Sequence, residues 1–237
     1  MTFEWQVLLQ DTGAGERYLD WLLSAWGWTL AVSACAWVLA CACGALIGVL
    51  RTLPGWWRSL GTLWVEGFRN IPLLVQLFLW YHVLPALMPA LRELSGFMLV
   101  VLALGLFTSA RVAEQVRAGI ESLPRGQRLA AQALGLRLPQ VYRHVLLPQA
   151  LRLALPPLTS EAMSIIKNSS VAFAVSVSEL TLFAMQAQEE TSRGIEIYLA
   201  VTGLYALSAF AVNRVFAGIE KKMRVPGFIV SAGTGGH

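Results

Sequence analysis

The residues of this chain whose types and spacing could do chemistry are charged and polar side chains set inside long apolar runs. Glu66 with Arg69, and Arg111 with Glu114, are spaced i,i+3, so each pair can share one face of a helix. Another apolar run contains a cation followed by three hydrogen-bonding side chains, namely Lys167, Asn168, Ser169 and Ser170. A charge at bilayer depth costs roughly 2.5–3.5 kcal/mol and usually faces a bundle interior or a cavity. These groups therefore predict either a polar pathway through a membrane or interhelical contacts that fix the packing of helices.

The sequence offers no arrangement typical of catalysis, metal binding or nucleotide binding. The histidines lack metal-ligand spacing, and no phosphate-cradling glycine loop, Ser-His-Asp order or pair of catalytic carboxylates can be identified. The three cysteines lie in the first apolar run, at Cys35, Cys41 and Cys43, where free cysteine usually behaves as a small hydrophobic residue. We therefore expect a chain that is not an enzyme, has no metal site and binds no cofactor itself.

Composition and run length indicate which elements must position these side chains. Hydrophobic residues make up 56% of the chain and charged residues 14%, whereas soluble domains carry about 25% charged residues. Apolar runs occur at Leu22–Leu50, Leu60–Leu84, Leu94–Val116, Ala150–Val177 and Ile195–Phe216. A run of roughly 20 apolar residues crosses a bilayer as a helix, because a helix satisfies its own backbone groups there. The predicted fold is all-α, an integral membrane bundle of about five transmembrane helices.

Basic residues outside the apolar runs predict the orientation of the chain. Residues 51–59, residues 117–147 and the tail after residue 216 hold Arg51, Arg58, Arg117, Arg125, Arg128, Arg137, Arg143, Lys221, Lys222 and Arg224. The alternate connections hold only Arg17, Arg92 and Arg193. Because basic loops stay on the cytoplasmic side, we expect the N-terminus outside and the C-terminus inside. The net charge of +4 thus reflects topology, and the basic residues are too dispersed to predict a nucleic-acid partner.

These expectations divide the chain into three parts. Residues 1–21 form an outer N-terminal segment, residues 22–216 the membrane domain, and residues 217–237 a cytoplasmic tail. The N-terminal segment is acidic and lacks a basic region, so we expect no cleaved signal peptide and a first span that is retained.

The connection over residues 117–147 is too polar to cross the membrane and has the pattern of a helix. We expect Ser122 to cap its start and Pro124 to occupy its first turn. Gly135 suits a left-handed C-terminal cap, and Pro139 follows shortly after. Small side chains at Ala130, Ala131 and Ala133 would let another surface approach closely. Two roles fit this helix, which either rests on the membrane surface or docks onto another protein.

The spacing of Ala130-Ala131, Gly135, Val145 and Leu147-Pro148 resembles the Glu-Ala-Ala loop of ABC importer permeases. Leu129 stands where that motif has glutamate, and Val145 stands where it has isoleucine. The resemblance implies that this segment is the coupling helix, which in the family docks into a cleft of the ATPase subunit. The residues that it assigns to coupling are Leu129, Ala130, Ala131, Gly135, Leu136 and Pro148.

Other segments extend the resemblance over roughly residues 18–226. Residues 66–76, 147–152 and 167–170 are similar to polar amino-acid permeases, and residues 107–117 are similar to their glutamate/aspartate branch. The resemblance implies a multi-pass permease of a bacterial inner membrane with a periplasmic N-terminal segment. The implied partners are a second permease subunit (identical or paralogous), an ATP-binding ABC subunit that holds ATP and magnesium, and a periplasmic amino-acid-binding protein.

Within that family, the charged groups have more specific interpretations. An acidic amino acid carries two carboxylates, and a guanidinium binds a carboxylate in bidentate fashion, so we expect Arg111 to contact the substrate. A purely structural role is the alternative. Arg69 and the polar residues 167–170 are further pathway candidates, although the Glu66–Arg69 pair also fits mutual neutralisation.

The fourth span contains two adjacent prolines, which should disturb its helix. Pro156-Pro157 should break or kink the fourth span about one turn before Glu161.

The alternatives to a glutamate/aspartate permease are a permease for another polar amino acid and an ion-coupled secondary transporter. The latter would need internal inverted repeats, which we do not find.

Overall fold

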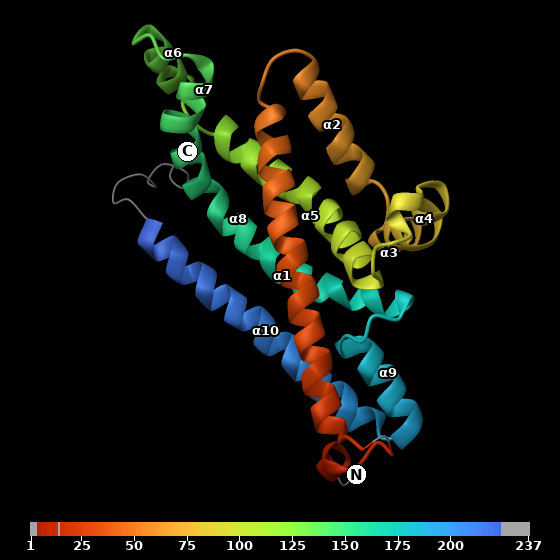
Figure 1. The fold of residues 1–237 in the computed structure, drawn as a ribbon. Helices are drawn as coiled ribbons and strands as arrows, with labels where there is room; N and C mark the ends of the chain where they lie inside the picture. The colour runs from red at the N-terminus through yellow and green to blue at the C-terminus, as the bar shows by residue number, and fades with distance from the viewer. Residues whose placement is uncertain (1–3, 14, 224–237) are drawn as a thin grey trace, which may run out of the picture.

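The computed structural model describes residues 4–13 and 15–223, and over these residues the chain is helical with no β-strand. Among them, three helices are long and apolar enough to cross a membrane, α1 (Tyr18–Leu50), α5 (Gly96–Glu121) and α10 (Gly194–Met223). Two bent pairs of helices bring the number of spans to 5 when each pair counts as one (Figure 1). The predicted all-α membrane bundle is confirmed. The part of the predicted tail that covers residues 224–237 lies outside the described residues.

The second predicted span, Leu60–Leu84, is wrong as a continuous helix. α2 (Trp56–Arg69) is followed by a 100° bend before the helices between Leu73 and Leu87. Pro72 explains the break, because it has no N–H to donate and disfavours helical geometry at the residue before it. The carbonyl of Phe68, which would normally accept from residue 72, instead accepts from Gln76 Nε2 at 2.6 Å. The elements after the bend are α3 (Leu73–Phe78), η2 (Leu79–Val83), α4 (Leu84–Leu87) and η3 (Pro89–Leu91).

The fourth predicted span is not broken at its pair of prolines. α8 (Leu147–Asn168) continues through Pro156 and Pro157, so the helix is not broken there, and a kink at that point stays a prediction. A membrane helix tolerates proline where neighbouring helices and polar side chains compensate for the missing hydrogen bond. A 53° bend comes later, between η5 (Ser169–Val175) and α9 (Leu180–Thr191). Ser176, in the left-handed conformation with φ of 58°, ends η5 at that point.

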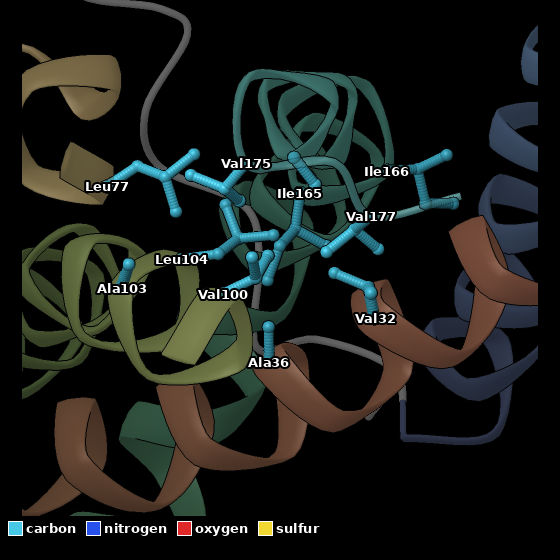
Figure 2. Packing of buried hydrophobic residues seen from close by; sticks show 11 residues of the cluster. Val32, Ala36, Leu77, Val100, Ala103, Leu104, Ile165, Ile166, Val175 and Val177 are labelled. Carbon is cyan, nitrogen blue, oxygen red and sulfur yellow. The ribbon is translucent and has the colours of Figure 1, made fainter. Parts of the chain in front are cut away.

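The largest hydrophobic cluster lies where α1, α3, α5 and α8 meet (Figure 2). Val32 of α1, Val100 and Leu104 of α5, Ile165 of α8 and Leu77 of α3 are almost fully buried in it. Lipid tails are as apolar as these side chains, so the cluster stabilises the bundle through close packing and not through exclusion of water.

Two glycines allow α1 and α5 to approach closely. A Cβ atom on Gly44 would lie 2.6 Å from Cβ of Val112, and one on Gly48 would lie 2.8 Å from the carbonyl oxygen of Ala113. Glycines spaced by four residues on one face are a common device for bringing membrane helices together. The α1–α5 contact therefore requires glycine at both positions.

The connections between spans lie at two ends of the bundle (Figure 1). The N-terminal end of α1 and α9 lie at one end. The opposite end carries α6 (Arg125–Ala133) and α7 (Leu138–Val141), on the same side as the turn between α1 and α2. The predicted basic connections over residues 51–59 and 117–147 are thus at the same end. The short elements not yet given are η1 (Trp5–Leu9) and η4 (Tyr142–Leu146).

Candidate functional site

A polar cavity of about 450 Å³ lies between α2, α5 and α8. Its lining consists of Arg69, Phe107, Arg111, Glu114, Gln115, Ala118 and Glu161. Arg69 is the last residue of α2, Glu161 belongs to α8, and the other residues belong to α5. Two of the predicted pathway residues, Arg69 and Arg111, therefore share one cavity although they are far apart in the sequence.

Arg111 keeps its guanidinium accessible in this cavity. Its side chain is 47% exposed, and its Cζ lies 5.3 Å from the centre of the Phe107 ring, within cation–π range. Arg111 Nη1 is 3.8 Å from Glu161 Oε2, which is an ion pair but too long for a hydrogen bond. The alternative in which Arg111 pairs with Glu114 is not what the structure shows, because Glu114 binds Arg51, Arg69 and Arg117.

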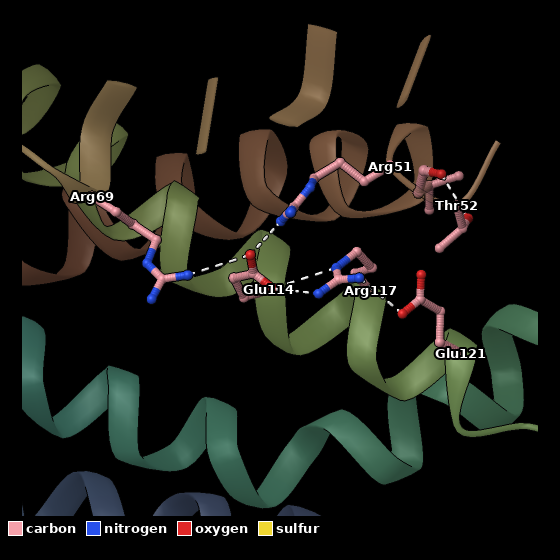
Figure 3. A network of polar contacts seen from close by, with 7 residues as sticks. Arg51, Thr52, Arg69, Glu114, Arg117 and Glu121 are labelled. Carbon is pink, nitrogen blue, oxygen red and sulfur yellow. Dashed lines mark hydrogen bonds and ion pairs between the residues drawn. The ribbon is translucent and has the colours of Figure 1, made fainter. Parts of the chain in front are cut away.

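Glu114 is the centre of an ion-pair network that joins α1, α2 and α5 (Figure 3). It accepts from Arg51 Nη1 at 2.5 Å, from Arg117 Nη2 at 3.1 Å, and from Arg69 Nη1 at 3.4 Å. Arg117 also donates to Glu121 at 2.9 Å. Arg69 thus pairs across to α5, so the alternative in which it pairs with Glu66 is not what the structure shows either. α2 ends at Arg69, which frees this side chain to reach the neighbouring helix.

The polar residues 167–170 lie apart from the cavity lining. They stand at the junction of α8 and η5 and not in the middle of an apolar helix as predicted. Ser169 is fully buried and donates to the carbonyl oxygen of Ile166 at 2.7 Å, and Ser170 donates to that of Lys167 at 2.8 Å. Lys167 is exposed and Asn168 is half-buried. The hydroxyl groups of Ser169 and Ser170 are thus hydrogen-bonded to backbone carbonyl groups at the end of α8. A role of residues 167–170 in transport stays a prediction.

The predicted coupling segment forms a helix. The predicted cap at its C-terminal end is confirmed, and the predicted cap at its N-terminal end is wrong. Gly135 has φ of 82° and donates to the carbonyl oxygen of Gln132 at 2.9 Å, while Leu136 donates to that of Ala131 at 3.2 Å. These two bonds form the predicted left-handed cap. Ser122 does not cap the start, because α5 continues to Glu121 and the Ser122 hydroxyl donates back to Gly119. α6 begins at Arg125 with Pro124 just before it.

The two faces of α6 separate the predicted coupling residues. Ala131 is buried against the chain itself, in a cluster with Ile120 and Val141. Leu129 is 65% exposed and Leu134 is 82% exposed. Ala130, Gly135 and Pro148 are also exposed, and Leu136 is half-buried. One apolar face of α6 is therefore left uncovered, as a surface that docks onto another protein would be.

Comparisons with known proteins decide the class. Residues 40–225 match the sequence model of a protein family described as the binding-protein-dependent transport system inner membrane component. The chain belongs to this family. The glutamate/aspartate import permease protein GltJ of Escherichia coli strain K12 is 43% identical, over 95% of this chain and 96% of that protein. The probable glutamine ABC transporter permease protein GlnM of Bacillus subtilis is 34% identical, over 76% and 82% of the two chains.

A solved structure agrees with the fold of this inner membrane permease. The crystal structure of an amino acid ABC transporter with histidines superimposes with a TM-score of 0.79 and 27% identity, covering 94% of this chain and 100% of that one. The permease is therefore a multi-pass protein of the inner membrane and a transport component. The chain belongs to a family of binding-protein-dependent transport components, and this membership replaces the alternative interpretation as an ion-coupled secondary transporter.

Several residues of the permease's cavity and network were missed as functional candidates from the sequence. In the sequence, Glu161 is only a neighbour of the prolines, and Arg51 is only one of the basic residues that indicate topology. Gln115 and Phe107 are only parts of the segment that resembles the glutamate/aspartate branch. A signal existed for Phe107, because it precedes Arg111 by four residues and so lies on the same helical face. Arg51 and Glu161 reach the network and the cavity through helix packing, which local spacing does not encode.

Proposed function

We propose that this permease conducts acidic amino acids, glutamate or aspartate, through the membrane in an ATP-driven ABC importer. The observation that carries the proposal is the 43% identity with a glutamate/aspartate import permease over almost the whole of both chains. The matched segment of α5 includes Arg111, which lines the polar cavity with a half-exposed guanidinium. A permease for another polar amino acid is the second candidate, because the relative from Bacillus subtilis is named as a probable glutamine permease.

The chemistry of the cavity supports an anionic substrate. Arg69 and Arg111 enter it from two different helices, and each is about half exposed. Their ion pairs, at 3.4 Å and 3.8 Å, are longer than an optimal charged hydrogen bond of about 2.7–2.9 Å. A guanidinium that is loosely paired can exchange its partner for a substrate carboxylate at low cost. Arg69 and Arg111 are therefore the residues that we expect to contact substrate carboxylates.

The partners follow from the proposed class. A second permease subunit, identical or paralogous, would complete the translocation pathway, and a periplasmic amino-acid-binding protein would deliver the substrate. ATP-binding subunits would hold ATP and magnesium and would dock on the exposed face of α6. Closure of those subunits would move α6 and turn the spans outward, and hydrolysis would reset them. In this arrangement the N-terminus is periplasmic and the C-terminus cytoplasmic.

The substrate assignment is tested by uptake into vesicles that contain the assembled transporter. Arg111→Tyr should abolish uptake of labelled glutamate and aspartate while the complex still assembles. Arg214→Tyr is a matched control, because Arg214 is also exposed and also stacks on a phenylalanine four residues earlier, at 4.8 Å from the Phe210 ring. Unchanged uptake in Arg111→Tyr, or equal loss in both variants, would contradict the role of Arg111. Competition across the twenty amino acids would separate an acidic preference from a glutamine preference.

The docking surface is tested by co-purification with the ATP-binding subunit. Leu134→Asp places a charge on the exposed leucine that directly follows α6 and should remove that subunit from the purified complex. Leu9→Asp makes the same change at a leucine that is 58% exposed near the other end of the bundle, and it should leave the complex intact. Retention of the ATP-binding subunit by Leu134→Asp would count against α6 as the docking helix.

A further inference from the structure

The cavity offers charges of both signs to a ligand, and these match the charges of an acidic amino acid. Such a molecule has two carboxylates and one ammonium group. The cavity presents two loosely paired guanidiniums, of Arg69 and Arg111, together with the carboxylates of Glu114 and Glu161. The two arginines fit the two carboxylates of the ligand. The remaining question is which glutamate is free to receive the ammonium group.

Glu114 is occupied by the protein itself. Its two oxygens accept from three arginines, at distances between 2.5 Å and 3.4 Å. The residue at the centre of this network already has donors on both oxygens. A substrate ammonium would have to displace an arginine from it, so Glu114 is a poor acceptor for a ligand.

Glu161 is the opposite case. Its side chain is only 14% exposed, and Oε2 is a buried atom with no hydrogen-bond partner among the described residues. The nearest cation, Arg111 Nη1, lies 3.8 Å from that oxygen. A buried charged group without hydrogen bonds is costly, so Glu161 gains more than Glu114 from a donor that enters the cavity. An ammonium group supplies up to three N–H donors.

We propose that Glu161 binds the ammonium group of the transported amino acid while Arg69 and Arg111 bind its carboxylates. This inference rests on the proposed function and adds the group that distinguishes an amino acid from a simple dicarboxylate. Glu161 lies on α8 and the arginines lie on α2 and α5, so one substrate would connect all three walls of the cavity. The role is that of a specificity residue that touches the substrate.

The alternative role of Glu161 is to act only as counter-ion to Arg111. The two roles predict opposite results for Glu161→Gln. If Glu161 binds the ammonium, the variant loses affinity for glutamate. If Glu161 only neutralises Arg111, the variant frees that guanidinium and binds every dicarboxylate more tightly.

The test compares glutamate with glutarate, which has the same two carboxylates but no ammonium group. Both are measured as competitors of labelled glutamate on the permease–ATPase complex in nanodiscs, without binding protein. The wild-type complex should prefer glutamate over glutarate by about tenfold or more, which is the change expected from about 1.4 kcal/mol. Glu161→Gln should lose that preference by weakening glutamate, with glutarate unchanged or tighter. Glu66→Gln, an exposed glutamate of α2 outside the cavity lining, should keep the wild-type preference.

The outcomes separate this inference from the proposed function. A Glu161→Gln complex that still prefers glutamate by the wild-type factor overturns the inference and leaves the acidic substrate in place. A wild-type complex that binds neither compound overturns both. If Glu161→Gln does not fold, Glu161→Asp retains the charge on a shorter side chain and should keep part of the preference. An unchanged preference in Glu161→Asp, in a complex that elutes as the wild type does, also overturns the inference, because the shorter side chain withdraws the carboxylate from the ammonium group.

Discussion

Arg51 Nη1 donates to Glu114 Oε1 at 2.5 Å. Arg51 caps the C-terminal end of α1 and Glu114 lies within α5, so this bond joins the two helices. The Arg51 side chain is only 10% exposed, so its charge is largely withdrawn from solvent. Arg69 of α2 and Arg117 of α5 bind the same carboxylate. One glutamate thus holds together three segments at a level where α1, α2 and α5 converge.

Glu114→Ala should destabilise the permease strongly, because it leaves Arg51 buried without a partner. Breaking a buried ion pair costs about 3–5 kcal/mol. For a chain of this size, a loss of about 3 kcal/mol lowers Tm by roughly 6–12 °C, measured by thermal unfolding of the purified complex. Glu121→Ala is the control, because the Glu121 side chain is 46% exposed and its pair with Arg117 is worth about 0–1 kcal/mol. Equal Tm values for the two variants would argue against the network.

Gly44→Ala should separate α1 from α5. The new methyl group would lie 2.6 Å from Val112 and 2.8 Å from the Ser109 carbonyl oxygen, and that oxygen belongs to the backbone of α5. Overpacking of this kind costs about 1–3 kcal/mol. Gly27→Ala on the same helix meets nothing within 4 Å and should leave Tm unchanged or raise it. A Gly44→Ala protein with wild-type Tm would show that the helices are not in this contact.

Tyr205→Phe should weaken the joint between α9 and α10. The Tyr205 hydroxyl donates to Glu179 Oε2 at 2.6 Å, and Glu179 is fully buried. The same carboxylate caps α9 by accepting from the N–H groups of Thr181 and Leu182. A hydrogen bond to a charged group is worth about 1.5–3 kcal/mol, so Tm should fall. Tyr198→Phe removes a hydroxyl from a tyrosine that is 41% exposed on the same helix, and it should have little effect.

Gly135→Ala should loosen the end of α6 without a steric clash. No atom lies within 4 Å of the position that Cβ would take, but φ of 82° costs an alanine roughly 1–2 kcal/mol. Amide hydrogen exchange over residues 125–136 should therefore speed up. Gly126→Ala, also in open space but in helical geometry, should slow exchange in the same segment. Faster exchange in both variants would mean that the effect is not due to the left-handed cap.

Features that the lipid environment imposes could be predicted from the sequence. The first run was expected over Leu22–Leu50 and forms α1 over Tyr18–Leu50, because a bilayer admits only helices of sufficient apolar length. The left-handed cap at Gly135 could also be predicted, since it depends on one residue and its neighbours. Arg111 was identified because a charge at that depth requires a reason.

Features that depend on packing between distant segments could not be predicted. The i,i+3 spacing allowed Arg69 and Arg111 to pair with carboxylates three residues away, whereas each pairs with a glutamate on another helix. The partners Arg51 and Glu114 are 63 residues apart in the sequence. The effect of each proline on its helix could not be predicted either, because Pro72 lies at the break in its span while α8 continues through Pro156 and Pro157.

The burial of Ala131 has a mechanical consequence. The inner face of α6 is packed against Ile120 at the end of α5 and against the segment that leads into Ala150 of α8. These are the two helices that carry Arg111 and Glu161 into the lining of the cavity. A force applied to the outer face of α6 would be transmitted to both helices together. In the proposed transporter, the distance between the Arg111 guanidinium and the Glu161 carboxylate would therefore change with the position of α6.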